Sequence, residues 1–262
     1  MDRRTYLGSL GVVGVTSVAG CLGDALGGNG DDGAGADETN TVLEPPTIER
    51  GDPSYPIHGE EFPSFSIRDP LKDETVTLDD FVGERPFVMT YIYTSCPDGA
   101  CPMLLQHLKR IQKDAVKRGY EDDVALLAMT FDPNRDTPDA LRSFAAQIGI
   151  DYEAETWHFL RPENNETAKT IMTDTFGLPL QRREEMPNGN SSTTNGSTTN
   201  SSSGTGSSHD HGGYMFTHSS LVELVNDRGI VERAYPKAAY PREGINGQVI
   251  LEDTRTVVGV DS

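Results

Sequence analysis

The sequence predicts an α/β protein in which a central mixed sheet is flanked by helices. Two apolar runs, at 86–94 and 124–131, are rich in β-branched and aromatic residues, as is typical of strands buried on both faces. Each run is followed by a segment with helical periodicity, which predicts two successive β–helix–β units. Farther on, an alternating segment at 220–225 leads through the turn 226–229 into a second strand at 230–235, which predicts a hairpin.

The remaining elements follow in an order that completes this architecture. The expected sequence of elements is strands at 65–69, 75–78 and 86–94, a helix whose apolar face begins at Met103, a strand at 124–131, a helix at 139–148, a strand at 157–160, a helix at 166–176, the hairpin, and a last helix. Thr137 is expected to cap the second helix, with Pro138 in its first position. Two β–helix–β units followed by a hairpin and a helix make a thioredoxin-like fold.

The composition limits the partners of the chain. Its 262 residues include 41 Asp and Glu against 22 Lys and Arg, for a formal net charge of −19. Such a surface is repelled by nucleic-acid phosphates and by anionic lipid headgroups, so no nucleic-acid partner is expected. Only three cysteines are present, which excludes a multi-disulfide scaffold. An acidic chain with six lysines resembles the proteins of salt-loving archaea, in which high ionic strength screens self-repulsion.

The first twenty residues predict an export signal. Arg3-Arg4 precedes a charge-free stretch at 7–19, which is too short for a bilayer core of ~30 Å but fits a twin-arginine-type signal peptide. Val18-Ala19-Gly20-Cys21 resembles a lipobox, in which Cys21 becomes the lipidated N-terminus. An ordinary signal peptide with an incidental cysteine is the alternative. The chain is therefore expected to be exported and anchored to the outer face of the cell membrane as a lipoprotein.

Two segments lack the apolar residues that a core needs. Residues 21–61 are Gly- and Asp-rich and are expected to form an acidic flexible tether, so the folded domain is expected at 62–262. Residues 187–213 repeat Ser, Thr, Asn and Gly and are expected to be a disordered insertion within that domain. Asn-X-Ser/Thr sequons, which are glycosylation candidates in an exported protein, begin at Asn165, Asn190, Asn195 and Asn200.

Cys96 and Cys101 lie between the first buried strand and the first amphipathic helix. Backbone N–H groups and the dipole at a helix start favour a thiolate over a thiol, which lowers the pKa of a cysteine there. Gly99 permits the tight turn that brings the two sulfurs together. Such a pair can form a disulfide or bind a soft metal ion, and an inert structural disulfide is the alternative.

Three motifs carry a resemblance to the Sco/SenC copper chaperones, which are thioredoxin-fold proteins that help to build the binuclear copper centre of cytochrome c oxidase. The motifs are Thr94-Ser95-Cys96-Pro97-Asp98 with Cys101-Pro102, Phe131-Asp132-Pro133-Asn134-Arg135-Asp136-Thr137-Pro138, and Thr217-His218-Ser219-Ser220-Leu221-Val222. The resemblance implies that Cys96, Cys101 and His218 bind copper, as Cu(I) or Cu(II). Three residues separate the two cysteines in the family, whereas four residues separate Cys96 from Cys101 here.

The resemblance implies delivery of copper to the copper-bearing subunit of a terminal oxidase. Two thiolates and one imidazole also suit Cu(I) on chemical grounds, whereas a structural zinc site usually has a fourth protein ligand. The alternative function is that of a thiol–disulfide oxidoreductase that uses Cys96 and Cys101 as its redox pair and reduces the cysteines of the oxidase. A peroxidase of the same fold is disfavoured because no peroxiredoxin motif surrounds Cys96.

Other polar residues have secondary or structural interpretations. His209 and His211 are either solvated or auxiliary metal ligands, and His107 and His158 are expected to be packing residues. Asp98 either tunes the metal site or shapes the turn. Structural roles are expected for Asp132, Arg135 and Asp136, with Arg135 bridging carboxylates beside the site.

Overall fold

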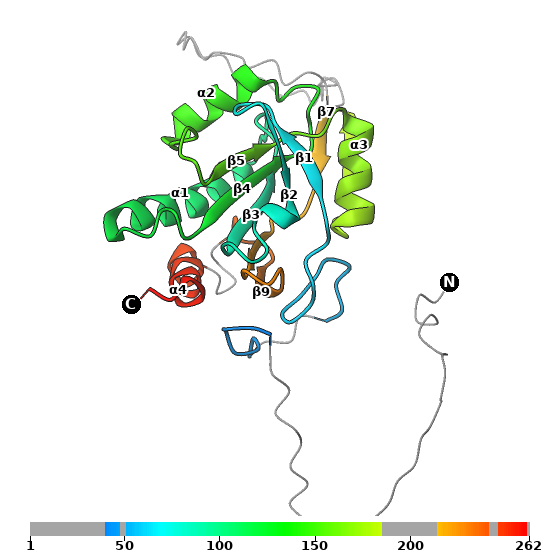
Figure 1. Ribbon diagram of the computed structural model, residues 1–262. Helices are drawn as coiled ribbons and strands as arrows, with labels where there is room; N and C mark the ends of the chain where they lie inside the picture. Colours follow the sequence, from blue (N-terminus) through cyan, green and yellow to red (C-terminus); the bar gives the residue numbers. More distant parts are fainter. Residues whose placement is uncertain (1–39, 48–50, 185–213, 241–245, 261–262) are drawn as a thin grey trace, which may run out of the picture. The chain divides into compact units, whose positions relative to one another are not determined.

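A five-stranded mixed sheet lies at the centre of the domain in the computed structural model (Figure 1). Its strands, in spatial order, are β5 (Trp157–Leu160), β4 (Ala125–Thr130), β3 (Phe87–Ile92), β8 (Val222–Val225) and β9 (Val231–Tyr235). β3, β4 and β5 are parallel, whereas β8 and β9 are antiparallel to their neighbours. All six residues of β3 and of β4 are buried because both faces of the sheet are covered. The predicted mixed sheet is confirmed.

The structure describes residues 40–47, 51–184, 214–240 and 246–260, which belong to one compact unit, Glu38–Ser262. The expected signal peptide at 1–20, Cys21, the first part of the tether and the insertion at 187–213 lie outside the described residues. So do three of the sequons and the histidines His209 and His211. Within the described ranges, no helix is both long and apolar enough to span a membrane.

Helices cover both faces of the sheet. α1 (Ala100–Arg118) packs on β3 and β4 and also contacts α2 (Pro138–Ile148) and α4 (Gly247–Val258). α3 (Asn165–Thr170) lies on the opposite side of the sheet from α1 (Figure 1) and continues into a π-helical turn, Ile171–Thr175. This arrangement confirms the thioredoxin-like fold and the expected helix at 166–176, apart from the widened last turn.

The second helix begins and ends where the sequence places its boundaries. The Thr137 hydroxyl accepts a hydrogen bond from the Ala140 N–H at 3.2 Å, and Pro138 occupies the first helical position. Gly149 ends the helix in the left-handed region, with φ of 77°. The capping residue Thr137 immediately follows Asp136.

Two further strand pairs lie outside the central sheet. β1 (Ser66–Asp69) and β2 (Glu74–Thr77) form an antiparallel hairpin that contacts β5, with a 3₁₀ turn, Leu78–Asp80, after it. β6 (Gln181–Glu184) pairs with β7 (Tyr214–Thr217) and was not predicted. Its residues are all exposed and polar, so no apolar alternation indicates a strand in the sequence.

The domain begins earlier than Phe62, because the second half of the expected tether packs on it. Glu60 and Glu61 extend the sheet edge, with the Val231 N–H donating to the Glu60 carbonyl at 2.9 Å and an isolated bridge joining Glu61 to Ile230. Farther back, the backbone N–H groups of Val42 and Leu43 donate to the carboxylate of Glu232. The sequence did not indicate that this segment packs on the domain, since a single buried carboxylate on β9 anchors it.

Replacing Glu232 tests this anchor. Its side chain is fully buried and also accepts from the Asn226 side chain at 2.7 Å. We expect Glu232→Ala to lower the free energy of unfolding by about 2–3 kcal/mol, because it leaves several N–H donors without their acceptor. Urea denaturation measures the loss. Glu252→Ala, at an exposed site on α4, is the matched control and should change stability by less than ~0.5 kcal/mol. Equal effects of the two substitutions would contradict the anchor.

Candidate metal centre

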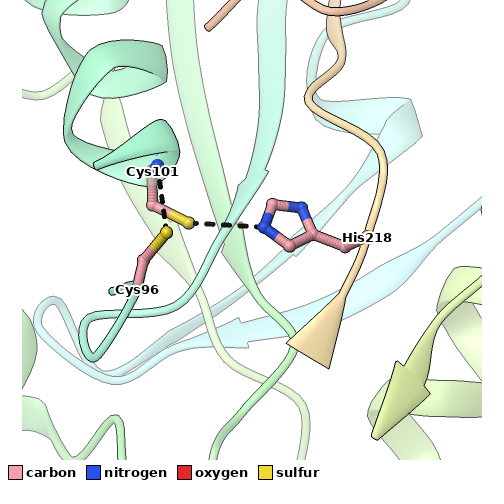
Figure 2. A group of neighbouring side chains, drawn as sticks. All are labelled: Cys96, Cys101 and His218. Atoms are coloured by element: carbon pink, nitrogen blue, oxygen red, sulfur yellow. Dashed lines mark hydrogen bonds between the residues drawn. The ribbon is translucent and has the colours of Figure 1, made fainter. Parts of the chain in front are cut away.

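The side chains of Cys96, Cys101 and His218 meet at one point of the structure (Figure 2). One ligand atom from each lies within 4.8 Å of the other two. Cys96 follows β3, Cys101 is the second residue of α1, and His218 follows β7. Cys101 is buried, whereas Cys96 and His218 are half-buried. The fold therefore brings together residues that are 117 positions apart in the sequence.

The loop between β3 and α1 presents the first sulfur to the start of the helix. Gly99 immediately precedes α1 with φ of 75°, a conformation that glycine adopts without steric cost. The Cys101 N–H, one of the free amides of the first helical turn, donates to the Cys96 sulfur at 3.4 Å (Figure 2). Four intervening residues thus still place the two sulfurs side by side, and no disulfide joins them in this structure.

A buried carboxylate holds the beginning of this loop. Asp136 accepts hydrogen bonds from the Thr94 N–H at 3.1 Å and from the Thr94 hydroxyl at 2.6 Å. The Thr130 hydroxyl, at the end of β4, also donates to Asp136. Burial raises the pKa of Asp136 to about 6, and these hydrogen bonds oppose that rise by stabilising the carboxylate. The carboxylate therefore fixes Thr94 two residues before Cys96.

The neighbouring Asp132 holds the segment that carries the histidine. It accepts hydrogen bonds from the Tyr214 hydroxyl at 2.8 Å and from the side chain of Asn165 at 3.1 Å, and it forms an ion pair with Arg135. Arg135 donates to the Tyr214 carbonyl at 2.9 Å and stacks on the Tyr214 ring, 3.8 Å from its centroid. Because Tyr214 begins β7, these contacts position the strand that leads to His218.

These contacts define the structural roles expected for Asp132, Arg135 and Asp136. Arg135 pairs with Asp132, while the hydrogen bonds to the Asp136 carboxylate come from threonines. Asn165, the first residue of a sequon, is half-buried, and its side-chain amide donates a hydrogen bond to Asp132. The sequence did not indicate the roles of Thr94 and Tyr214, since each acts through a partner distant along the chain.

His218 presents one ring nitrogen to the sulfurs. Its Nδ1 lies 3.0 Å from the carbonyl oxygen of Ser219, and since a carbonyl only accepts, Nδ1 carries the proton. Nε2 is therefore free as a lone-pair donor, and it lies 3.8 Å from the Cys101 sulfur (Figure 2). The rings of Phe131 and Tyr93 pack on the imidazole at centroid distances of 4.7 and 5.7 Å, which excludes water from that side.

The two sulfurs differ in acidity. A hydrogen bond from Cys101 lowers the pKa of Cys96 to about 6, against the cost of burial. Burial raises the pKa of the Cys101 thiol well above its ordinary value. At neutral pH the half-buried Cys96 is therefore a thiolate, and Cys101 keeps its proton until a cation replaces it.

Asp98 shapes the cysteine loop and also contacts the reactive sulfur. Its carboxylate accepts hydrogen bonds from the N–H of Ala100, the first residue of α1, at 3.0 Å and from the Tyr240 hydroxyl at 3.2 Å. The other contact, 2.9 Å to the Cys96 sulfur, favours the protonated thiol and opposes the lowered pKa. The sequence did not indicate Tyr240, which lies 142 residues away.

The remaining histidines of the described chain lie apart from this centre. His107 is buried on α1, and its Nε2 lies 2.9 Å from the Ala238 carbonyl oxygen, which confirms a packing role. His158 lies on β5 and packs against Phe81, but it also faces two carboxylates. A packing role therefore describes only part of its surroundings.

The donor set has a defined chemical preference. Two thiolates and one neutral imidazole nitrogen form a three-ligand site with soft character, which suits Cu(I), and an added ligand would accommodate Cu(II). The same pair of thiols can also form a disulfide after a modest movement of the loop. The geometry thus supports both metal binding and dithiol chemistry.

Alkylation kinetics test the unequal acidity of the two sulfurs. We expect the rate of reaction of Cys96 with iodoacetamide to be half-maximal near pH 6, because the thiolate is the nucleophile. Asp98→Asn should lower this midpoint, since the Asp98 contact raises the pKa of Cys96. Mass spectrometry of the metal-free, reduced chain assigns each modified cysteine. A midpoint near 9, the ordinary value, would contradict the assignment.

Comparisons with known proteins agree with the fold. The solved structure of a SCO1/SenC family lipoprotein from Bacillus anthracis str. Ames superposes with a TM-score of 0.53 at 16% identity, over 80% of this chain and 99% of that one. Apo Sco1 from Thermus thermophilus gives 0.51 at 18% identity, over 78% and 96%. BsSco, a member of the Sco family of cytochrome c oxidase assembly proteins, gives 0.50 at 17% identity, over 80% and 99%.

Sequence comparisons identify the family. The SCO1 protein homolog of Bacillus subtilis (strain 168) is 28% identical over 130 residues, which are 45% of this chain. The match spans 64% of that relative, less than two thirds of its length. The family model for SCO1/SenC matches residues 63–249, well over half of the sequence. The chain therefore belongs to the SCO1/SenC family.

Proposed function

We propose that this protein binds one copper ion through Cys96, Cys101 and His218 and delivers it to the copper-bearing subunit of a terminal cytochrome c oxidase during assembly. The observation that carries the proposal is the convergence of two sulfurs and an imidazole nitrogen within 4.8 Å. Membership of the SCO1/SenC family and the similarity to BsSco, from a family of oxidase assembly proteins, support it.

The exposure of the ligands suits a transient cargo. Cys101 is buried and His218 is packed against aromatic rings, so both ligands hold the ion from the protein side. Cys96 is half-buried on the loop, where an incoming ligand from a partner can replace its sulfur. Copper would thus pass by ligand exchange, with one new bond formed as each old bond breaks.

Copper binding is coupled to proton release. Because Cys96 is already a thiolate at neutral pH, the proton displaced by the ion is that of Cys101, whose pKa burial raises. The positive charge of the ion also offsets the cost of holding a second thiolate in a buried position. Copper affinity therefore increases with pH over the range in which Cys101 is protonated.

A thiol–disulfide oxidoreductase is the second candidate, favoured by the lowered pKa of Cys96. The Cys96 thiolate would attack a substrate disulfide and form a mixed disulfide. Cys101 would then displace the substrate thiolate, losing its proton as the Cys96–Cys101 bond forms. Two electrons pass from the protein dithiol to the substrate, which leaves as a dithiol, while the protein keeps the new Cys96–Cys101 disulfide. This reaction needs both cysteines but not His218.

Copper titration separates the two functions. We expect the reduced chain to bind one Cu(I), and Cys96→Ser, Cys101→Ser and His218→Ala to weaken binding at least tenfold, because each removes a ligand. Competition with a chromogenic Cu(I) chelator measures the affinity. His58→Gln is the control, since His58 contacts the Glu232 carbonyl and lies outside the centre.

Dithiol exchange in the same variants completes the test. The metal-binding proposal predicts that His218→Ala loses copper affinity while its exchange rate with a model disulfide stays within about threefold. If His218→Ala binds copper as tightly as the unmodified chain and only the cysteine variants differ, the copper proposal fails and the oxidoreductase remains.

We also propose that the chain is exported and attached to the outer face of the membrane through Cys21, as its twin-arginine and lipobox-like sequences indicate. A single acyl chain gives weak attachment and a second chain makes it stable. Cys21→Ser should therefore release the exported protein from the membrane fraction, as measured by immunoblotting after fractionation. Retention of the variant in that fraction would refute lipid anchoring at Cys21.

A further inference from the structure

A second group of metal-ligating side chains lies between the β1–β2 hairpin and β5. Asp69 ends β1, Glu74 begins β2, and His158 is the second residue of β5. One ligand atom of each lies within 4.8 Å of the other two. This group shares no residue with the copper centre, and no motif in the sequence indicated it.

The separations within this group are those of metal ligands. His158 Nδ1 lies 3.5 Å from a carboxylate oxygen of Asp69 and 3.3 Å from one of Glu74. Both separations exceed the 2.7–3.2 Å of a protein N–H···O hydrogen bond. They match the edge of a tetrahedron with metal–ligand distances of ~2.0–2.1 Å, which is about 3.3–3.4 Å. The imidazole nitrogen thus lies from each carboxylate oxygen at about the separation of two ligands of one ion of the size of Zn²⁺, and the two carboxylate oxygens lie within 4.8 Å of each other.

His158 Nδ1 is itself a buried atom without a hydrogen-bond partner among the described residues. A buried imidazole nitrogen without a partner is costly, and a bound cation would satisfy it. The side chain of His158 is only 12% exposed, and the Phe81 ring packs on it at a centroid distance of 6.0 Å. The ring is therefore held in place with Nδ1 directed at the two carboxylates.

Backbone amides orient the most buried ligand. Asp69 is 1% exposed, and its two oxygens accept from the Leu71 N–H at 2.9 Å and from the Phe159 N–H at 3.2 Å. Each oxygen keeps a further lone pair that can bind an ion. Hydrogen bonds from surrounding groups orient the ligands of other metal sites in the same way. The nearby Lys72 does not occupy the position, since its ammonium donates to the carbonyls of Ala154 and Glu155.

The group opens to solvent on one side. Glu74 is 48% exposed, and a hollow of about 220 Å³ is lined by Glu74 and His158. Glu155 and Asp80 also line this hollow and make it attractive to cations, although Arg85 lies there as well. An ion can reach Glu74 and His158 through the hollow, and water can complete its coordination.

We propose that Asp69, Glu74 and His158 form a second metal site, which binds a divalent cation such as Zn²⁺ through one imidazole nitrogen and two carboxylate oxygens. Such a donor set is harder than two thiolates and an imidazole, so it discriminates against Cu(I). The ion would join the two strands of the hairpin to the edge of the central sheet. The inference does not depend on copper binding.

Co²⁺ titration tests the site in the full chain carrying Cys21→Ser, Cys96→Ser and Cys101→Ser, which removes every thiol. We expect one Co²⁺ per chain with visible d–d absorption, displaced by one Zn²⁺. Adding His158→Gln or Glu74→Gln should weaken binding at least tenfold. Glu155→Gln is the matched control, a carboxylate of the same hollow outside the ligand set, and should change affinity by less than twofold.

Circular dichroism of each variant separates loss of the site from loss of the fold. Asp69 is left unchanged because its carboxylate also holds two backbone amides. Binding that is unaffected by both His158→Gln and Glu74→Gln in folded variants would overturn the proposal, because the cobalt would then be held by surface acids. Absence of a one-to-one complex in the cysteine-free parent would overturn it as well.

Discussion

The buried carboxylate of Asp136 is the contact on which the candidate metal centre depends. It joins Thr94, two residues beyond the end of β3, to Thr130, the last residue of β4, and the cap of α2 comes immediately after it. A carboxylate taken out of water is stable only when several donors surround it, and three hydrogen-bonding groups from two threonines meet this need. Within the same motif, Asp132 and Arg135 hold the start of β7. One short segment therefore fixes both the cysteine loop and the strand that leads to the histidine.

The surroundings of the ligands then determine their chemistry. The Cys101 amide and thiol stabilise negative charge on Cys96, while burial disfavours charge on Cys101. The Ser219 carbonyl fixes the proton of His218 on Nδ1 and leaves Nε2 facing the sulfurs. Aromatic rings cover one side of the imidazole, so the site is dry toward the core and open toward the loop. This asymmetry is what a protein that receives and releases an ion requires, and the proposed copper transfer rests on it.

Much of this arrangement could be predicted from the sequence because it depends on local signals. The buried strands have continuous apolar runs, Thr137 and Pro138 mark a helix start, and the alternating hairpin is interrupted by a turn with Gly229. The position of Cys96 and Cys101 at a helix start follows from the same pattern. His218 could be placed only through its resemblance to a family motif, since nothing local brings it within reach of residues 117 positions earlier.

What the sequence did not indicate depends on single long-range polar contacts. Glu232 accepts hydrogen bonds from the backbone near position 42, and β6 is an exposed polar strand. His158 lies beside carboxylates of the β1–β2 hairpin. None of these contacts is indicated by a periodic pattern of apolar residues in the sequence. The central claim, that two sulfurs and one imidazole nitrogen hold copper, is tested most directly by X-ray absorption at the copper edge of the Cu(I)-loaded chain. The account predicts a first shell of two sulfur atoms and one nitrogen atom. A shell without sulfur, or one unchanged by His218→Ala, would contradict it.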